Sequence, residues 1–539
     1  MKQAVAAVLM LAALMSWSRS GWCEARAIPD QVPKTHWSCT EIEELGAKYQ
    51  TGGILPDKQD VQRRDVAAAF LVILEKVRQK CETEGPEALS AEDRERLTAL
   101  HEALKQELES FEAYKIVRDT LEKILAAPEE PPYLFKIGVS GFLRGEGSGN
   151  FTYSLSGSSY TPGSGVGRMV YRIMPYLEWS PTDFLEMKVQ GQGYGFTLGS
   201  PRDSQYALYQ AYLDLSLPET KRVSLRLGQQ EFSYGSAFII GANSCYNGRT
   251  FDAALLRVKP LSEFTLDLLG GYYAAPQNHY FKELLAGAYL KQLLREGTGI
   301  EAYYFRDQGP LFGLSGEHLD TFGLRGSARF GPAALEFEPV YETGQRTNPN
   351  TGTLDTISAW GGHVDLSVDA TIGGFKNTFV CGYAYGSGSQ DAADGRSLRN
   401  EFSNANNNTS LTGDLGFIGD LSGITTTNGV HASGLQIATA GWGINLFKDL
   451  NFSASGHYFW ANDTPPGMSR NLGLETDFIL TWNINEDTAL LIAYDRFFTG
   501  GFFRDATGST SDIDYGYVML QFNLFAGKKK PAKLTPTAP

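Results

Sequence analysis

The sequence predicts an all-β transmembrane barrel of about 18 antiparallel strands, preceded by a small α-helical N-terminal domain and a long helical stalk. Three observations predict it. From residue 133 onward, apolar and polar residues alternate with the period of two that β-strands require. Short and long polar connections follow one another in strict alternation along that region. The 539-residue chain also has 59 Gly, 26 Tyr and 31 Phe, which is a composition typical of β-rich proteins.

Charge and hydropathy exclude two other classes of protein. The net charge of −14 argues against a nucleic-acid partner, which usually requires a basic face. After the N-terminus no segment has 18 consecutive apolar residues, so a helical membrane protein is excluded. A membrane β-barrel is not excluded by the lack of a long apolar run, because its strands are only half apolar.

The first residues have the order of a secretory signal. Lys2 precedes an apolar run over residues 4–15, and small residues allow cleavage after Ala25 or Ala27. We therefore expect residues 1–25 to be a signal peptide and the protein to leave the cytoplasm.

The cysteines that follow the expected signal peptide do not indicate a metal site. No CxxC pair occurs, so a zinc site is not predicted. Cys39 and Cys81 either form a disulfide, as an oxidising compartment permits, or are two unrelated buried thiols.

Residues 28–82 predict a small helical domain that resembles a single S-layer homology (SLH) domain. The resemblance rests on five short segments, which are Pro29-Asp30-Gln31-Val32-Pro33, His36-Trp37, Ile42-Glu43-Glu44-Leu45, Ile54-Leu55-Pro56-Asp57 and Gln62-Arg63-Arg64-Asp65. Such domains bind cell-wall polymers, so the resemblance implies peptidoglycan or an attached wall glycan as a partner. It implies Trp37, Arg63 and Arg64 as wall-binding residues, although a tryptophan here is more often part of the core.

Residues 88–127 predict one long helix. Leucines and other apolar residues recur at steps of three or four and form a narrow seam, until prolines follow from Pro128. Two interpretations stay open. The helix folds back on the small domain, or it forms a coiled-coil stalk that joins chains into a homo-oligomer.

The connections after residue 133 give the strand count. Eight short turns alternate with nine long loops, which makes 17 connections and about 18 strands. One of the expected long loops covers residues 146–167, and the longest covers residues 386–434. This alternation is typical of outer-membrane barrels, and a barrel of this size encloses water. We therefore expect a barrel over residues 133–526 within outer-membrane lipid, with the small domain and a tail over 527–539 in the periplasm.

The barrel region also resembles a known family. The segments that carry the resemblance are Glu178-Trp179-Ser180-Pro181-Thr182-Asp183, Leu225-Arg226-Leu227-Gly228, Gln230-Glu231-Phe232-Ser233-Tyr234-Gly235, Asn247-Gly248-Arg249-Thr250-Phe251-Asp252 and Phe497-Phe498-Thr499-Gly500-Gly501-Phe502. Together they are similar to the alginate export family of outer-membrane porins. The resemblance implies an 18-stranded monomeric barrel whose basic lumen conducts an anionic polyuronate.

Cations on the polar face of the strands are the candidate pore residues. Inside a low-dielectric wall, such groups raise the local concentration of anions, and Arg binds carboxylates through its two-pronged guanidinium group. The candidate set, which also includes two residues of the family motif, is Arg168, Arg172, Lys188, Arg226, Arg249, Asp252, Arg325 and Arg329. The alternative is that these cations pair with Glu and Asp on neighbouring strands and only hold the wall together.

Motifs for catalysis are missing from the sequence. Seven His residues occur, with no HExxH pattern and no GxSxG elbow. We predict no enzyme activity, no cofactor and no metal. Three hypotheses remain, namely a wall-tethered porin for small solutes, a channel for an anionic polysaccharide, and a structural tether between outer membrane and wall with a plugged or minor channel.

Overall fold

The computed structural model divides the chain into two compact units, one before residue 133 and one over Tyr133–Lys530. It describes residues 30–51, 55–56, 58, 60–84, 89, 91–111, 114, 133–154, 157–198, 203–217, 222–241, 248–274, 284–295, 297–308, 316–347, 352–389, 402, 413–418 and 420–529. The expected signal peptide and most of the expected tail lie outside these residues.

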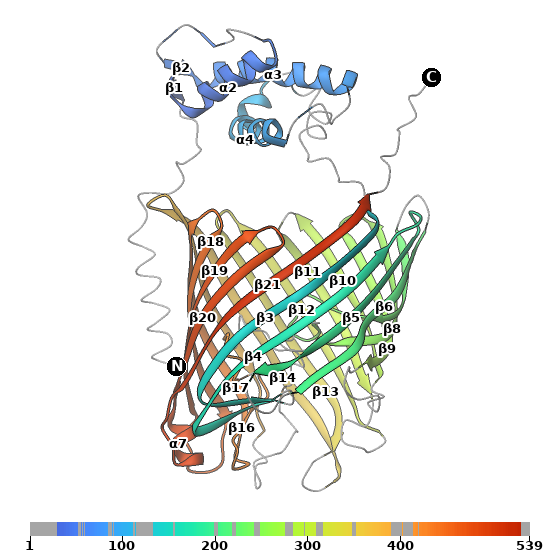
Figure 1. Cartoon of the computed structure of the whole chain (residues 1–539), viewed down its shortest axis with the longest axis vertical. Coiled ribbons are helices and arrows are strands. Elements are labelled where there is room, and N and C mark those ends of the chain that lie inside the picture. The colour runs from blue at the N-terminus through green and yellow to red at the C-terminus, as the bar shows by residue number, and fades with distance from the viewer. Residues whose placement is uncertain are drawn as a thin grey trace. The chain divides into compact units, whose positions relative to one another are not determined.

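The N-terminal unit packs three helices and a two-stranded sheet around a core of its own. The elements are β1 (Gln31–Pro33), α2 (Trp37–Lys48), β2 (Asp60–Gln62), α3 (Arg63–Glu84) and α4 (Ala91–Leu108). Ile42 and Leu45 of α2 meet Phe70 and Ile73 of α3, and all four side chains are fully buried. We refer to residues 30–114 as the N-terminal module (blue in Figure 1).

The prediction of one helix over 88–127 is wrong at its centre. Helix α4 ends at Leu108, where Ser110 and Phe111 donate backbone hydrogen bonds to Glu107 and Leu108 in a tight turn. The seam residues of α4 are fully buried in the core of the same module, together with Tyr114. The first half of the seam thus packs within the chain, and residues 115–127 lie outside the described part.

Two cysteines belong to this core. Cys39 and Cys81 are both buried and both free thiols, so the alternative of two separate thiols holds in this structure. None of the described helices is long and apolar enough to cross a membrane.

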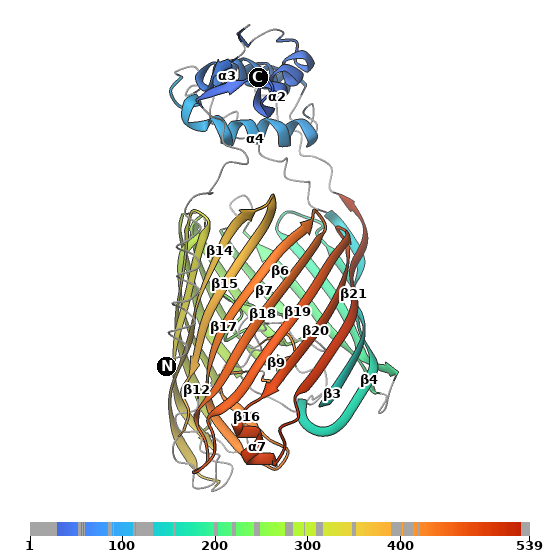
Figure 2. The ribbon, with the colours of Figure 1, turned by 90° about the vertical axis from the view of Figure 1, so that its left-hand side faces the viewer.

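The second unit is a closed antiparallel barrel of 18 strands, which confirms the predicted barrel (Figures 1 and 2). The wall strands are β3 (Tyr133–Ser154), β4 (Gly157–Trp179), β5 (Leu185–Leu198), β6 (Asp203–Ser216), β7 (Val223–Gln230), β8 (Thr250–Leu261), β9 (Phe264–Ala274), β10 (Leu284–Arg295), β11 (Thr298–Gln308), β12 (His318–Phe330), β13 (Ala333–Thr347), β14 (Leu354–Ile372), β15 (Phe375–Gly386), β17 (His431–Phe447), β18 (Leu450–Asp463), β19 (Asn471–Asn485), β20 (Thr488–Thr499) and β21 (Ile513–Lys529).

The barrel closes where its last strand pairs with its first. β21 runs antiparallel to β3 in register from Asp514 opposite Gly149 to Lys529 opposite Tyr133. Both ends of the barrel therefore lie at the end that carries the eight short turns, which we call the turn end. We call the opposite end the loop end. The expected loop over 146–167 is wrong, because β3 and β4 continue as a paired hairpin to Ser154 and Gly157.

Two further elements lie at the loop end. A short strand, β16 (Gly423–Thr425), pairs with the start of β17, and a helix, α7 (Gly501–Thr507), joins β20 to β21. Phe502 and Phe503 of α7 are fully buried, and Phe503 packs on Phe417, Phe497 and Phe502.

The outer face of the barrel is apolar, with aromatic residues gathered toward both ends. Toward the turn end the exposed rings are Phe135, Trp179, Phe184, Phe330, Phe375, Phe447 and Trp482. Toward the loop end they are Tyr206, Tyr272, Phe322, Trp360, Tyr385 and Phe498. Such aromatic girdles mark the two membrane–water interfaces of outer-membrane barrels, and they explain why large apolar side chains remain exposed here.

Candidate functional site in the barrel lumen

Strand alternation separates the lipid face from the lumen face. On β4 the odd-numbered Met169, Ile173 and Leu177 are exposed on the outer face, whereas Arg168 and Arg172 are each only 9% exposed and face inward. Because side chains alternate across a strand, each inward cation meets the inward residues of both neighbouring strands.

Arg144, Arg168 and Arg226 are paired with acids on the same strand or on a neighbouring strand. Glu146 accepts from Arg168 at 2.6 Å and from Arg144 at 2.9 Å. Arg226 pairs with Asp214 at 2.7 Å. These pairs agree with the alternative that such cations hold the wall together.

Two predicted cations make weaker contacts within the lumen. Arg172 donates to the amide oxygen of Gln192 at 2.8 Å, and its guanidinium lies over the Tyr209 ring. Lys188 Nζ is 3.3 Å from Glu178 Oε1. Both belong to one cavity on the inner face of β21, β3, β4 and β5, described below.

Three other predicted residues lie elsewhere. Arg329 is half exposed at the turn end, where it pairs with Asp369 at 3.1 Å. Asp252 is exposed and opposite Tyr272 on the outer face, so it does not line the lumen. Arg249 lies just before β8, among the electrostatic neighbours of Asp307.

Arg325 occupies an acidic part of the lumen. It pairs with Glu301 at 2.9 Å and with Glu336, and its Nε is 3.9 Å from Glu338 Oε2. This side of the lumen carries several carboxylates that are under 5% exposed, namely Glu301, Glu338, Glu342, Glu475, Asp477 and Asp495. The lumen therefore has a basic side at β3–β7 and an acidic side at β11–β20.

Sequence reasoning missed Lys136, Arg144 and Glu146 as lumen residues. Arg144 and Glu146 were missed because the glycine-rich end of β3 lacks a clear apolar face and Glu146 opens the segment expected to be a loop. The available signal was a period of two, because the polar residues at the even-numbered positions 136, 140, 144 and 146 all fall on one face of the strand.

A cavity of about 510 Å³ opens on the basic side. Its lining holds three cations, Lys136, Arg172 and Lys188, against one carboxylate, Glu178. Among the described residues Lys136 makes no ion pair, and its ammonium group lies 3.9 Å from the Phe525 ring centroid. The complete lining is Lys136, Ser140, Gly141, Phe142, Arg172, Met174, Tyr176, Glu178, Lys188, Gln190, Met519, Gln521, Phe522 and Asn523.

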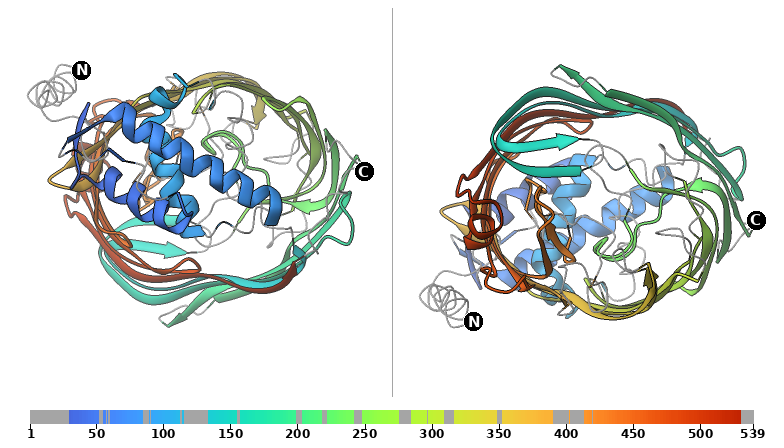
Figure 3. Two further views of the ribbon diagram at one scale, coloured as in Figure 1. Left: turned by 90° about the horizontal axis from the view of Figure 1, so that it is seen from above. Right: turned by 90° about the horizontal axis from the view of Figure 1, so that it is seen from below.

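Two loops from the loop end fold into the barrel. Residues 231–241, green in Figure 3, lie inside the ring of strands and bury Phe238 fully. In the longest loop, the backbone N–H of Leu415 donates to Glu475 on the wall at 3.1 Å. Tyr517 of β21 donates to Asp414 at 2.8 Å. These two loops therefore narrow the lumen. The sequence did not show whether they fold into the barrel or away from it.

The predicted wall-binding residues lie in the N-terminal module. Arg63 pairs with Glu107 at 2.9 Å and donates to the carbonyl of Ala103, so it joins α3 to α4. Arg64 lies over the Phe111 ring, and Trp37 packs partly buried against the core.

Comparison with known proteins decides the family. The family profile described as alginate export matches residues 188–515, which is more than half of the chain. The chain belongs to the alginate export family. No curated protein sequence matches it significantly.

Solved structures show the same fold at low identity. OccK9 (OpdG) of Pseudomonas aeruginosa has a TM-score of 0.50 at 11% identity, covering 73% of this chain and 100% of its own. OpdQ of P. aeruginosa has the same TM-score and identity, with 72% and 98% covered. A BenF-like porin from Pseudomonas fluorescens Pf-5 has a TM-score of 0.49, 10% identity, and 73% and 99% coverage. This alginate export family member thus has the barrel fold of these solved outer-membrane proteins.

Proposed function

We propose that the barrel conducts small acidic sugars, with uronates as the substrate class. The observation that carries the proposal is the excess of cations in the lumen cavity, where Lys136, Arg172 and Lys188 face one carboxylate. A uronate presents one carboxylate and several hydroxyls. The cations attract the carboxylate, and Gln190, together with the other lining amides, offers hydrogen bonds to the hydroxyls.

The separation of charge across the lumen supports the same proposal. Acids at β11–β20 face a basic side at β3–β7, so an anionic solute is drawn to one wall and repelled from the other. The inward loops leave less room for a polymer than an open barrel has, which favours short sugars over a long polyuronate chain.

Single-channel conductance in a planar bilayer tests this function. Glucuronate and short oligouronates added to the chamber should block the current of the wild-type channel, and neutral glucose at equal concentration should block it less. The Lys136→Gln, Lys188→Gln double variant should need about tenfold more uronate for half block, which corresponds to about 1.4 kcal/mol. Lys448→Gln is the matched control, since Lys448 carries the same charge in a turn outside the cavity.

Two results would overturn the proposal. Conductance indifferent to uronate at all concentrations would indicate a general porin. A current too small to detect in the folded wild-type protein would indicate that the barrel is mainly structural.

A second proposal is that the N-terminal module tethers the barrel to peptidoglycan or an attached wall glycan. Its support is that the module is a separate compact unit with its own core, as a binding domain requires. The full chain should then sediment with purified sacculi, whereas a chain lacking residues 30–114 should stay in solution. The Trp37→Ala and Arg64→Ala variants should bind less than a control altered at exposed Lys58. Equal sedimentation of all these chains would contradict the tether.

A further inference from the structure

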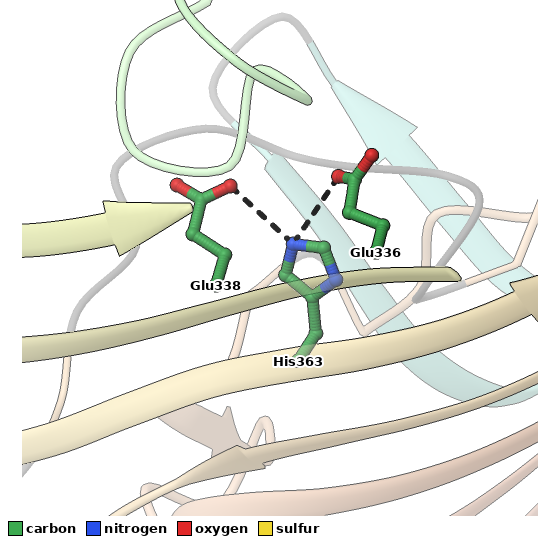
Figure 4. Close-up of side chains that lie close together, drawn as sticks. All are labelled: Glu336, Glu338 and His363. Carbon is green, nitrogen blue, oxygen red and sulfur yellow. Dashed lines mark ion pairs between the residues drawn. The ribbon is translucent and has the colours of Figure 1, made fainter. Parts of the chain in front are cut away.

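A second cluster of chemical groups lies on the acidic side of the lumen, apart from the cavity. Glu336 and Glu338 of β13 and His363 of β14 point toward one another (Figure 4). One ligand atom from each lies within 4.8 Å of the other two. His363 Nε2 is 3.5 Å from Glu338 Oε2 and 4.0 Å from Glu336 Oε1. The register places Glu338 directly opposite His363.

A carboxylate behind the ring orients the histidine. Asp365 Oδ2 is 2.5 Å from His363 Nδ1. When Nδ1 donates this hydrogen bond, the Nε2 lone pair points at the two glutamates. Histidines that bind metals almost always donate their other ring N–H to a carboxylate, carbonyl or water in this way. Phe238 packs edge-on against the ring at 4.9 Å and covers it from water.

The wall binds each glutamate most closely through one oxygen, and the other oxygen is directed at the histidine, where Glu338 Oε2 also accepts a hydrogen bond from Ser236. Arg325 binds Glu336 through Oε2, whereas Oε1 faces His363. Tyr303 donates to Glu338 Oε1 at 2.7 Å, whereas Oε2 faces His363.

The carboxylates around His363 outnumber the cations, so the charge balance favours binding of a divalent cation. The carboxylates of Glu301, Glu336, Glu338 and Asp365 meet two described cations, Arg325 and Lys291. A histidine binds a metal through its neutral ring, and in that form the group carries a net charge of −2, from four carboxylates and two cations. Buried charges are costly unless they are paired or coordinate a metal. A divalent ion would neutralise the group.

We propose that Glu336, Glu338 and His363 form a divalent transition-metal site of the zinc type. One nitrogen and two carboxylate oxygens are a ligand set that suits Zn²⁺. A tetrahedral Zn²⁺ ion with bonds of about 2.0 Å holds its ligand atoms about 3.3 Å apart. The two separations to His363 Nε2, 3.5 and 4.0 Å, need only a small contraction, and the two glutamate oxygens lie within 4.8 Å of each other.

The inward loop supplies a fourth group. Ser236 Oγ is 3.1 Å from Glu338 Oε2 and 3.3 Å from His363 Nε2. Gly235, at a φ of +58°, makes the turn that brings Ser236 to the wall, and a side chain there would press on Arg325. The hydroxyl, or a water that it holds, completes the coordination. The ion would link β13 and β14 to the 231–241 loop and so fix that loop in the lumen.

The same atoms resemble a Ser–His–Asp triad, but their arrangement favours a metal. A general base needs an Nε2 lone pair that faces the serine hydroxyl. Here Glu338 approaches the same nitrogen, and Ser236 donates to Glu338. A carboxylate at that point competes with the serine for Nε2, whereas it is an additional ligand for a metal.

Metal binding to the full chain in detergent tests the site. Titration with Zn²⁺ alone should give one bound ion per chain, and Co²⁺ should give the intense visible absorption bands of tetrahedral coordination. His363→Gln and Glu336→Gln should each weaken Zn²⁺ binding by at least about 100-fold, the upper end of the loss seen for outer-shell changes. His457→Gln is the matched control. His457 is equally buried, lies 3.3 Å from Asp477, and belongs to no three-ligand group among the described residues.

Folding is checked separately, through the shift in gel mobility that a folded barrel shows when it is heated. A folded wild-type chain that takes up no Zn²⁺ at 100 times the protein concentration would overturn the site. So would Zn²⁺ affinity that His363→Gln and Glu336→Gln leave unchanged, because the ion would then bind elsewhere. The measurement does not depend on conductance, so its failure is distinct from failure of the proposed uronate channel.

Discussion

Glu146 on β3 lies directly opposite Arg168 on β4, and its Oε1 atom is 2.6 Å from Arg168 Nε. Both side chains are almost fully buried, and Arg144 binds the other carboxylate oxygen at 2.9 Å. The arginine that the sequence places in the pore is therefore part of a buried charge network in the wall.

Neutralising the shared acid should destabilise the barrel strongly. In Glu146→Gln, Arg144 and Arg168 lose the buried charge between them, and breaking a buried pair costs about 3–5 kcal/mol. Urea unfolding in detergent micelles, followed by tryptophan fluorescence, measures the free energy of unfolding. The control is Asp369→Asn, whose pair with Arg329 is half exposed on both sides and should cost about 1 kcal/mol or less. Equal losses in the two variants would contradict the network.

A side chain at Gly361 should displace the longest loop from the lumen. The Cβ of Gly361→Ala would overlap the ring of Phe402, which is fully buried against β14. Overpacking of this kind costs about 1–3 kcal/mol, and we expect the channel conductance to rise as the loop loosens. Gly443→Ala is the control, because the nearest atoms to its Cβ are 3.9 Å away. The interpretation fails when both variants conduct like the wild type.

Alkaline pH should unfold the N-terminal module through Tyr49. Burial, and the hydrogen bond to Asp93 at 2.9 Å, raise the pKa of Tyr49 above its ordinary value. The folded state thus favours the protonated phenol. This stabilisation is complete below the unfolded pKa of about 10 and is lost as the pH rises above it.

Circular dichroism at 222 nm between pH 7 and 11.5 measures this transition. The Tyr49→Phe variant should lose about 1 kcal/mol at neutral pH with the hydrogen bond, and its helical signal should depend less on alkaline pH. A transition of the same steepness in both chains would assign the pH dependence to other groups.

The apolar seam of α4 should be needed for folding rather than for joining chains. Leu100 is fully buried against the core of its own module, so Leu100→Asp places an unpaired charge in that core. We expect the 222-nm signal of the module to fall while native mass spectrometry gives the same assembly mass as the wild type. A variant that keeps its helices but changes from oligomer to monomer would instead support a stalk between chains.

The sequence by itself determined the strand count, the eight short turns and the alternation between a lipid face and a lumen face along the strands. It did so because alternation with a period of two and the residues of tight turns are local signals. It also indicated that inward cations could pair with Glu and Asp on neighbouring strands, without saying which acids meet which cations. The end of the stalk helix at Leu108 was missed, since the seam continues in the sequence beyond the point where the chain turns.

The tertiary structure alone decided which of these groups meet. Arg168 pairs with Glu146 and His363 faces Glu338 because of strand register, which barrel closure and packing fix over the whole wall. Ser236 reaches His363 across more than 120 positions of sequence because its loop turns inward to bury Phe238. No local sequence pattern predicts that this loop folds inward, because the apolar surface that buries Phe238 forms only when the barrel has closed.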